Sequence, residues 1–160
     1  MTLIFNASPL IILAKSGLLD CFINLSNDAW IPQAVADEVS RVKNPDDPAR
    51  CWLAGNSAIV HPLTPISRFV TAWDLGDGES AVISLAAAKP ESIAVLDDLA
   101  ARRCAQAMGL RMIGTIGLIL MAKQAGLIES ATHALEAVTA AGLFISSRHL
   151  DAIRIQAGES

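Results

Sequence analysis

The amino-acid sequence predicts an α/β fold with a mainly parallel central sheet in a single domain, residues 1–160. Short apolar, strand-like runs alternate with helical patterns along the chain, which is typical of a parallel sheet covered by helices. The length of 160 residues corresponds to one domain. Hydrophobic residues make up 52% of the chain against 18% charged, which argues against a disordered chain.

The first half of the chain begins with an apolar strand and a proline-initiated helix. Pro9 suits the first turn of that helix, with Ser8 as its cap. Pro32 opens a later helix, and the run NPDDP marks a surface loop. In chain order, this half predicts a strand at 3–5, helices at 9–17 and 18–25, a strand at 28–31, a helix at 32–42, a loop at 44–48, a helix to about 55, and a strand at 58–61.

The second half begins with an irregular or weakly helical segment at 62–73, after which Asp77 caps a helix. A β-branched run then predicts a strand that ends at Asp97, and Gly109 closes the following helix. In chain order, this half predicts a helix at 78–88, a strand at 93–96, a helix to 108, a strand at 111–113, a helix at 114–126, and a helical extension at 130–160 with helices at about 130–141 and 147–157.

Charge and composition argue against several classes of protein. The net charge of −4 is mild evidence against the basic face of a general nucleic-acid coat, and 4% aromatic residues argue against a base-stacking platform. Cys21, Cys51 and Cys104 are widely spaced, which predicts free thiols in a reducing compartment. No signal peptide or membrane-spanning run is apparent, so we expect a cytoplasmic protein with no membrane partner.

Polar residues follow three of the predicted strands. In an open parallel sheet, ligands bind beyond the carboxyl ends of the strands, where the strand order reverses. The residues at these positions are Asn6 and Ser8, Asp97 and Asp98, and Gly114 and Thr115. Asp98 is explained equally well as the cap of the next helix, whereas Asp97 is left over at the strand end.

Two further acids lie on helix faces where a charge is unfavourable. At about 100° per residue, Glu38 lies on the border of the valine stripe of residues 32–42, and Glu79 lies on the apolar face of residues 78–88. A carboxylate directed at a core is costly unless it is paired, protonated or bound to a metal. As alternatives, Glu38 extends to water at the edge of an interface, and Glu79 gains from the helix dipole.

The acids and Asn6 together predict an all-oxygen site for Mg²⁺ or Mn²⁺. His61, His133 and His149 are scattered along the chain, which argues against zinc. An ion held by carboxylates orients and activates water and neutralises charge on a phosphodiester. The residues therefore favour chemistry on phosphate esters.

Five stretches carry a resemblance to a known family: NASPLIILAKSGLLD, IPQAVADEV, LGDGESAVISLA, VLDDLAARRCAQAMGL and IGTIGLILMAKQAGLI. They follow the family's order over roughly residues 3–128. The chain resembles PIN-domain proteins, in particular a branch predicted to bind nucleic acids and related to VapC-type toxin ribonucleases. The resemblance implies a three-layer α/β/α sandwich, a ribonuclease that uses Mg²⁺ or Mn²⁺, RNA as substrate, and an antitoxin partner. We expect a homodimer as well.

The resemblance also implies roles for individual residues. The family's second, third and fourth acids match the expected catalytic residues, Glu38, Glu79 and Asp97. The expected metal ligands are Asn6, Glu79, Asp97 and the adjacent Asp98. The expected substrate-binding residues are Ser8, Arg102, Arg103 and Thr115.

Three of the expected substrate-binding residues also have simpler explanations. Arg102 and Arg103 lie opposite the apolar side of their helix, so a solvated face explains them, and phosphate steering is the alternative. Thr115 suits the N-cap of its helix, and its hydroxyl is also placed to hold water or phosphate.

Asn6 departs from the family pattern, which has Asp at this position. An Asn carbonyl can ligate Mg²⁺ but brings no charge, so ion affinity and the pKa of a bound water depend on fewer negative groups. Two outcomes stay open. The protein is a ribonuclease, or it is a catalytically weak or inactive module that binds nucleic acid or protein.

Two rival classes complete the predictions. A phosphoacceptor receiver domain needs an acidic pair after the first strand and a Lys after a late strand, and residues 6–8 and 114–115 offer neither. An interaction module would use its acidic surface for a basic, antitoxin-like segment. The extension would then either cover the sheet or meet a partner through its apolar residues, Ala134, Leu135, Val138 and Ala141 on one helix and Leu150, Ile153 and Ile155 on the next.

Overall fold

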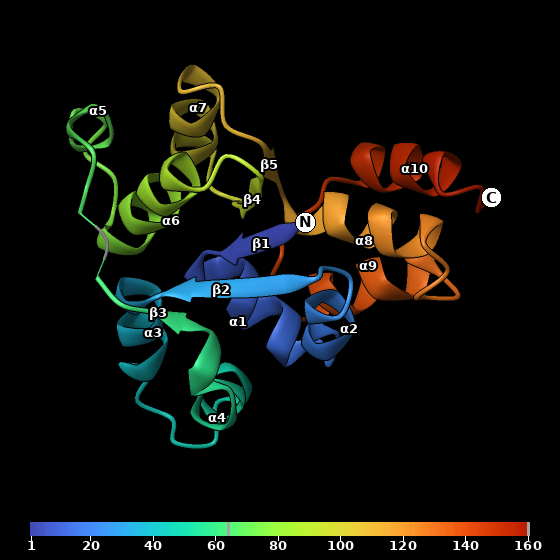
Figure 1. The fold of residues 1–160 in the computed structure, drawn as a ribbon. Coiled ribbons are helices and arrows are strands. Elements are labelled where there is room, and N and C mark those ends of the chain that lie inside the picture. The colour runs from blue at the N-terminus through green and yellow to red at the C-terminus, as the bar shows by residue number, and fades with distance from the viewer. Residues whose placement is uncertain (64, 160) are drawn as a thin grey trace.

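A five-stranded parallel sheet forms the centre of the computed structural model, which describes residues 1–63 and 65–159 (Figure 1). The strands are β1 (Thr2–Phe5), β2 (Asp28–Pro32), β3 (Val60–His61), β4 (Ser92–Val95) and β5 (Met112–Ile113). Their order is β3-β2-β1-β4-β5, and every neighbouring pair is parallel. The predicted α/β class is therefore confirmed.

Ten α-helices of the described residues surround this sheet. They are α1 (Ala7–Lys15), α2 (Leu19–Ile23), α3 (Gln33–Ser40), α4 (Pro48–Gly55), α5 (Arg68–Thr71), α6 (Asp77–Ala88), α7 (Leu99–Ala107), α8 (Thr115–Gln124), α9 (Ala131–Ala140) and α10 (Ser147–Gln156). Figure 1 shows α6 and α7 on one side of the sheet and α1 and α9 on the other, which gives the expected three layers.

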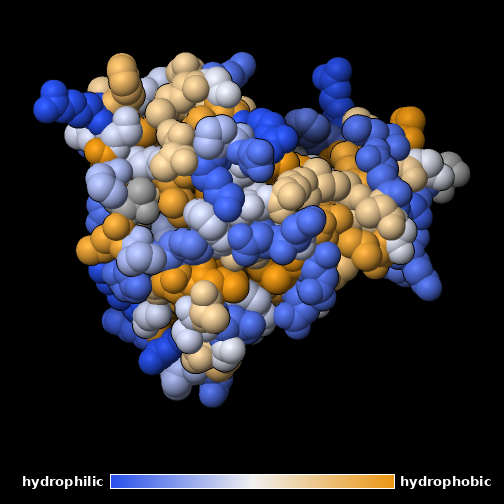
Figure 2. Space-filling model, in the orientation of Figure 1, coloured by the Kyte–Doolittle hydropathy of each residue, from blue (hydrophilic) through white to orange (hydrophobic). Residues whose placement is uncertain are grey.

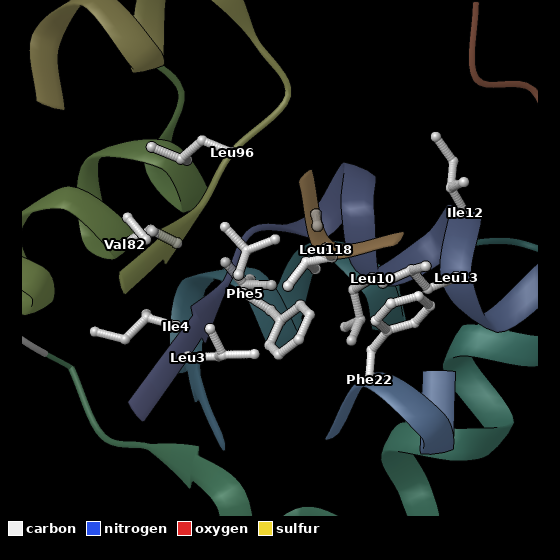
Figure 3. Packing of buried hydrophobic residues seen from close by; sticks show 14 of the residues in the cluster. Leu3, Ile4, Phe5, Leu10, Ile12, Leu13, Phe22, Val82, Leu96 and Leu118 are labelled. Carbon is white, nitrogen blue, oxygen red and sulfur yellow. The ribbon is translucent and has the colours of Figure 1, made fainter. Parts of the chain in front are cut away.

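The central strand β1 is buried on both faces. Leu3, Ile4 and Phe5 are all fully buried, as expected for a strand between two helical layers. Figure 3 shows that Ile4 points toward Val82 of α6, whereas Phe5 points toward Leu118 of α8 on the opposite face. The alternation of side chains along a strand explains why a short apolar run can join two layers.

The strand order places a crevice beyond the ends of β1 and β4. From β1 the chain proceeds to β2 and β3 on one side, whereas β4 and β5 lie on the other side, so the order reverses between β1 and β4. Phe5 lies beside Val95 in the register of these two strands. The residues that follow them, Asn6 and Leu96–Asp97, therefore occupy the switch point where open α/β sheets bind ligands.

Three predicted helix caps were wrong by one or two residues. The observed N-caps of α1, α6 and α8 are Asn6, Gly76 and Gly114, in place of Ser8, Asp77 and Thr115. Each observed cap has extended backbone, with ψ between 162° and 174°, and the next residue already turns into the helix. The predicted cap Asp98 is confirmed, since its Oδ1 accepts the N–H of Ala101 at 2.9 Å.

The segment before α6 differs in detail from the prediction. The expected strand at 58–61 is a 3-10 turn, Ser57–Ile59, followed by the two-residue strand β3. The stretch expected to be irregular or weakly helical contains the single-turn helix α5, and its Thr64 lies outside the described residues.

The C-terminal helices pack mainly against other helices. Helix α9 contacts α8 and α1, and α10 contacts α9. Ile153 is buried, but Ile155, expected on the same face of α10, is 78% exposed because two helical residues are about 200° apart. Figure 2 shows apolar surface over this part of the molecule.

The structure bears on the predictions about the cysteines and about membrane-spanning segments. Cys21, Cys51 and Cys104 are free cysteines. In the described parts of the chain, no helix combines the length and the apolar character needed to cross a membrane.

Candidate metal centre

Asn6 lies at the switch point, between the end of β1 and the start of α1. Its N–H donates to Val95 O at 3.2 Å, and its carbonyl accepts the N–H of Leu10 at 3.2 Å. The residue is 4% exposed, and within residues 1–63 and 65–159 its side-chain Oδ1 is buried and has no hydrogen-bond partner. A buried polar atom without a partner costs about 1–3 kcal/mol. The position therefore favours a ligand that binds this oxygen.

Glu38 of α3 brings a carboxylate to the same point. A Cβ atom added to Gly78 would lie 2.8 Å from Glu38 Oε2 and 3.3 Å from Asn6 Oδ1. Both oxygens therefore lie against the first turn of α6. The Glu38 side chain is exposed, as the water-facing alternative predicted. Two acceptor oxygens directed at one point favour a cation between them.

Glu79 folds back over the start of its own helix. Its Oε2 accepts the N–H of Gly76 at 3.2 Å and so closes the first turn of α6. Burial raises the pKa of Glu79, the hydrogen bond from Gly76 lowers it, and the negative charges of Asp98 and Glu38 raise it further. The three carboxylates therefore lie close enough to interact electrostatically.

Asp97 is held by the first residue of α8. Its Oδ1 accepts the N–H of Thr115 at 2.7 Å, and its Oδ2 accepts the Thr115 hydroxyl at 2.6 Å. Asp97 therefore satisfies the helix terminus that Thr115 was expected to cap. Thr115 is fully buried, so its hydroxyl is directed at Asp97.

Arg102 lies at the strand end and is only partly exposed. Its Nη1 donates to Leu96 O at 3.2 Å. A Cβ on Gly114 would lie 2.6 Å from this Nη1 and 3.0 Å from Asp97 Oδ1. The long side chain folds back over the helix start, so the guanidinium is half-buried beside Asp97. Arg103 and Ser8 are exposed.

A cleft of about 710 Å³ adjoins Glu38, between α3 and the segment that carries α5 and the start of α6. Its charged lining residues are Asp37, Glu38, Asp74, Asp77 and Arg41. Apolar side chains, Leu63, Ile66 and Leu75, complete the wall. Four carboxylates with one guanidinium give this cleft a negative potential that attracts cations.

A protein-family model described as a PIN domain matches residues 2–159. The chain belongs to the PIN-domain family. PIN domains are in general nucleases that commonly bind nucleic acids and generally use divalent metal ions. No curated protein matches the chain significantly.

The oxygen atoms at the switch point of this PIN domain fit the chemistry of a hard divalent ion. The buried Oδ1 of Asn6 and the Oε2 of Glu38 converge there, and Mg²⁺ and Mn²⁺ prefer such ligands. In the described ranges, no three His, Cys, Asp or Glu side chains gather closely enough to hold an ion. Glu79 is directed to Gly76 and Asp97 to Thr115, so a third ligand requires one of these side chains to rotate.

The structure brings the predicted residues together unequally. Asn6 and Glu38 both lie against Gly78. The carboxylate of Glu79 interacts electrostatically with those of Asp98 and Glu38. The sequence reading missed Gly78. Glycine inside a helix costs about 1 kcal/mol relative to alanine, so a glycine at the second position of α6 was a readable signal of close approach.

Proposed function

We propose that this PIN domain is a metal-dependent ribonuclease that hydrolyses phosphodiester bonds with Mg²⁺ or Mn²⁺. One observation carries the proposal. The buried Oδ1 of Asn6, which has no protein partner in the described chain, lies beside Glu38 Oε2 at the strand-order switch point. A neutral and a charged oxygen directed at one point favour a cation there, and PIN domains generally use divalent ions.

In this proposal, each residue of the site has a defined role. Asn6, Glu38, Glu79, Asp97 and Asp98 supply oxygen ligands, and Glu38, Glu79 and Asp97 are also the catalytic carboxylates. Thr115 fixes the orientation of Asp97 through two hydrogen bonds. A bound ion supplies an activated water and neutralises charge on the phosphate. Arg102, exposed Arg103 and exposed Ser8 contact the RNA backbone beside this point.

The proposal extends to partners. The enzyme acts as the toxin of a toxin–antitoxin pair, and the negative potential of the cleft beside Glu38 supports binding of a basic antitoxin segment. The homodimer uses the apolar surface of the C-terminal helices, where Phe144 is 91% exposed and Ile155 is 78% exposed. Light scattering of wild type and Phe144→Ser tests the dimer, and equal masses exclude this surface.

A ribonuclease assay across a Mn²⁺ titration tests the enzyme, with wild type, Asn6→Asp and Glu79→Gln compared. We expect wild type to cleave RNA, Asn6→Asp to need less metal, and Glu79→Gln to lose activity. Asn24→Asp adds the same charge on an exposed residue after α2 and is the matched control. Cleavage by Glu79→Gln at the wild-type rate would refute the assignment of the site.

A second candidate is a catalytically weak or inactive PIN domain that binds nucleic acid or protein. It is supported by the neutral Asn6 and by the absence, within the described residues, of a group of three carboxylates able to hold an ion. The same titration separates the two candidates. If wild type fails to cleave RNA at any Mn²⁺ concentration and Asn6→Asp cleaves it, the second candidate is correct.

A further inference from the structure

A second group of interacting side chains lies at the β2–β3 side of the sheet. Trp30 of β2 and His61 of β3 are stacked, with ring centroids 3.6 Å apart and 25° between their planes. Lys89 Nζ lies 3.7 Å from the centre of the Trp30 ring. His61 and Lys89 both approach the ring centre at contact distance, so they cover opposite faces of the indole. Asp28 Oδ2 accepts the Nε1–H of Trp30 at 2.5 Å and fixes the ring.

The backbone of His61 lies at the same end of the sheet as the candidate metal centre, but its ring stacks on an indole that Asp28 and Lys89 hold toward the opposite end. His61 is the last residue of β3 and pairs with Pro32, which lines the acidic cleft. The sheet order places β3 two strands from β1, whose carboxyl end carries Asn6. Neighbouring strands are about 4.8 Å apart, so the backbones of β3 and β1 are roughly 10 Å apart, and the His61 ring lies farther from the metal centre because it leans back on Trp30. A strand of RNA several nucleotides long would contact both positions.

The ring available to a further aromatic group is His61. Both faces of Trp30 are covered, whereas His61 is half-buried and retains surface open to solvent. Burial lowers the pKa of His61, Asp28 raises it and Lys89 lowers it, so the imidazole is neutral at pH 7. A flat, neutral ring held in place by Trp30 has little freedom left to lose when a ligand stacks on it.

We propose that His61 is a nucleobase-stacking subsite for single-stranded RNA, on which one base of the substrate strand stacks at a distance of several nucleotides from the cleaved phosphodiester. The subsite rests on the proposed ribonuclease function, because it binds the same substrate strand. Few aromatic residues argued against a stacking platform in the sequence. The fold nevertheless places a tryptophan and a histidine from different strands in one stack.

Binding of a fluorescently labelled octaribonucleotide without metal tests the subsite, since cleavage then plays no part. Base stacking on an aromatic side chain accounts for about 5- to 150-fold in affinity. We expect His61→Ala to weaken binding by that factor and His61→Phe to keep most of the affinity. The control His133→Ala, at an exposed histidine of α9, should bind as wild type does. If phenylalanine binds as weakly as alanine, stacking is excluded.

Oligonucleotides with a single abasic position separate stacking from a structural role of His61 in holding β3. Wild type should lose affinity at one abasic position, and His61→Ala should show no further loss at that position. An equal further loss in His61→Ala would overturn the subsite. Cleavage with Mn²⁺ is measured separately. If base-dependent binding requires His61 but the protein does not cleave RNA, the subsite is supported and the ribonuclease function is refuted. If the protein cleaves RNA but its binding does not depend on His61, the ribonuclease function is supported and the subsite is refuted.

Discussion

The substitution Gly78→Ala separates metal binding from folding in this PIN domain. The added Cβ would lie 2.8 Å from Glu38 Oε2, 3.3 Å from Asn6 Oδ1 and 3.4 Å from Val35 Cγ2. Glu38 is exposed and can rotate into water, whereas Asn6 and Val35 are buried and have little room to move. The carboxylate oxygen therefore leaves the point at which it meets Asn6.

The two effects on stability oppose each other. Alanine in place of a helical glycine stabilises by about 0.5–1 kcal/mol. Overpacking costs about 1–3 kcal/mol, at the low end here because the nearest atom ends a flexible side chain. The free energy of unfolding should change by less than about 2 kcal/mol, or a few degrees in Tm. Displacement of Glu38 should weaken Mn²⁺ binding by about 10- to 100-fold, the size of effect seen when groups around metal ligands are changed.

Isothermal titration with Mn²⁺ and thermal melting of the same samples measure both quantities. Gly55→Ala is the matched control, because a Cβ at this last residue of α4 meets no described atom within 4 Å beyond its chain neighbours and the backbone of its own helix. The control should keep wild-type metal affinity. If Gly78→Ala folds and binds Mn²⁺ as tightly as wild type, Glu38 and Asn6 do not hold the ion.

Two glutamates should respond to pH with opposite signs. Because burial raises the pKa of Glu79, its ionisation penalises the folded state, so Glu79→Gln should raise Tm at pH 7–8, and the gain should vanish as the pH falls toward 4.5. A pH-independent difference would argue against the buried charge. Hydrogen bonding by the Thr132 side chain, the N–H groups of Thr132 and Ala131 at 2.8 and 2.7 Å, and pairing with Lys123 hold the pKa of Glu159 well below the ordinary 4.5. Its stabilisation is therefore present above pH 4.5 and declines in more acidic solution, so Glu159→Gln should lower Tm at pH 7, and the difference from wild type should narrow without closing in melting curves recorded down to pH 3.

The fold could be predicted from the sequence because its signals are local. The apolar run of β1 and the cap at Asp98 are both readable from neighbouring residues. The other caps could not be predicted in this way. Thr115 is bound by Asp97, a residue 18 positions earlier, and such a bond exists only after β4 and β5 have paired.

The candidate site was predicted in composition but not in orientation. Helical periodicity placed Glu38 and Glu79 near an apolar border, and both lie beside the switch point. Periodicity treats a side chain as a direction from the helix axis, so it could not show that Arg102 folds back to Leu96. It also gave no sign that His61 stacks on Trp30, since these residues meet only through the pairing of β2 with β3.

The neutral Asn6 can be understood from the charges around it. The pKa of Glu79 is raised in part by Asp98 and Glu38, so carboxylates at this edge already repel one another when no ion is bound. Asn6 is 4% exposed, and an aspartate there would add both desolvation and repulsion to the folded state. The same charge would strengthen binding of a divalent ion. Asn6→Asp should therefore melt below wild type in EDTA and gain more than wild type from added Mn²⁺. Compared with aspartate, the neutral Asn6 therefore binds a divalent ion less tightly but leaves the fold more stable when no ion is bound.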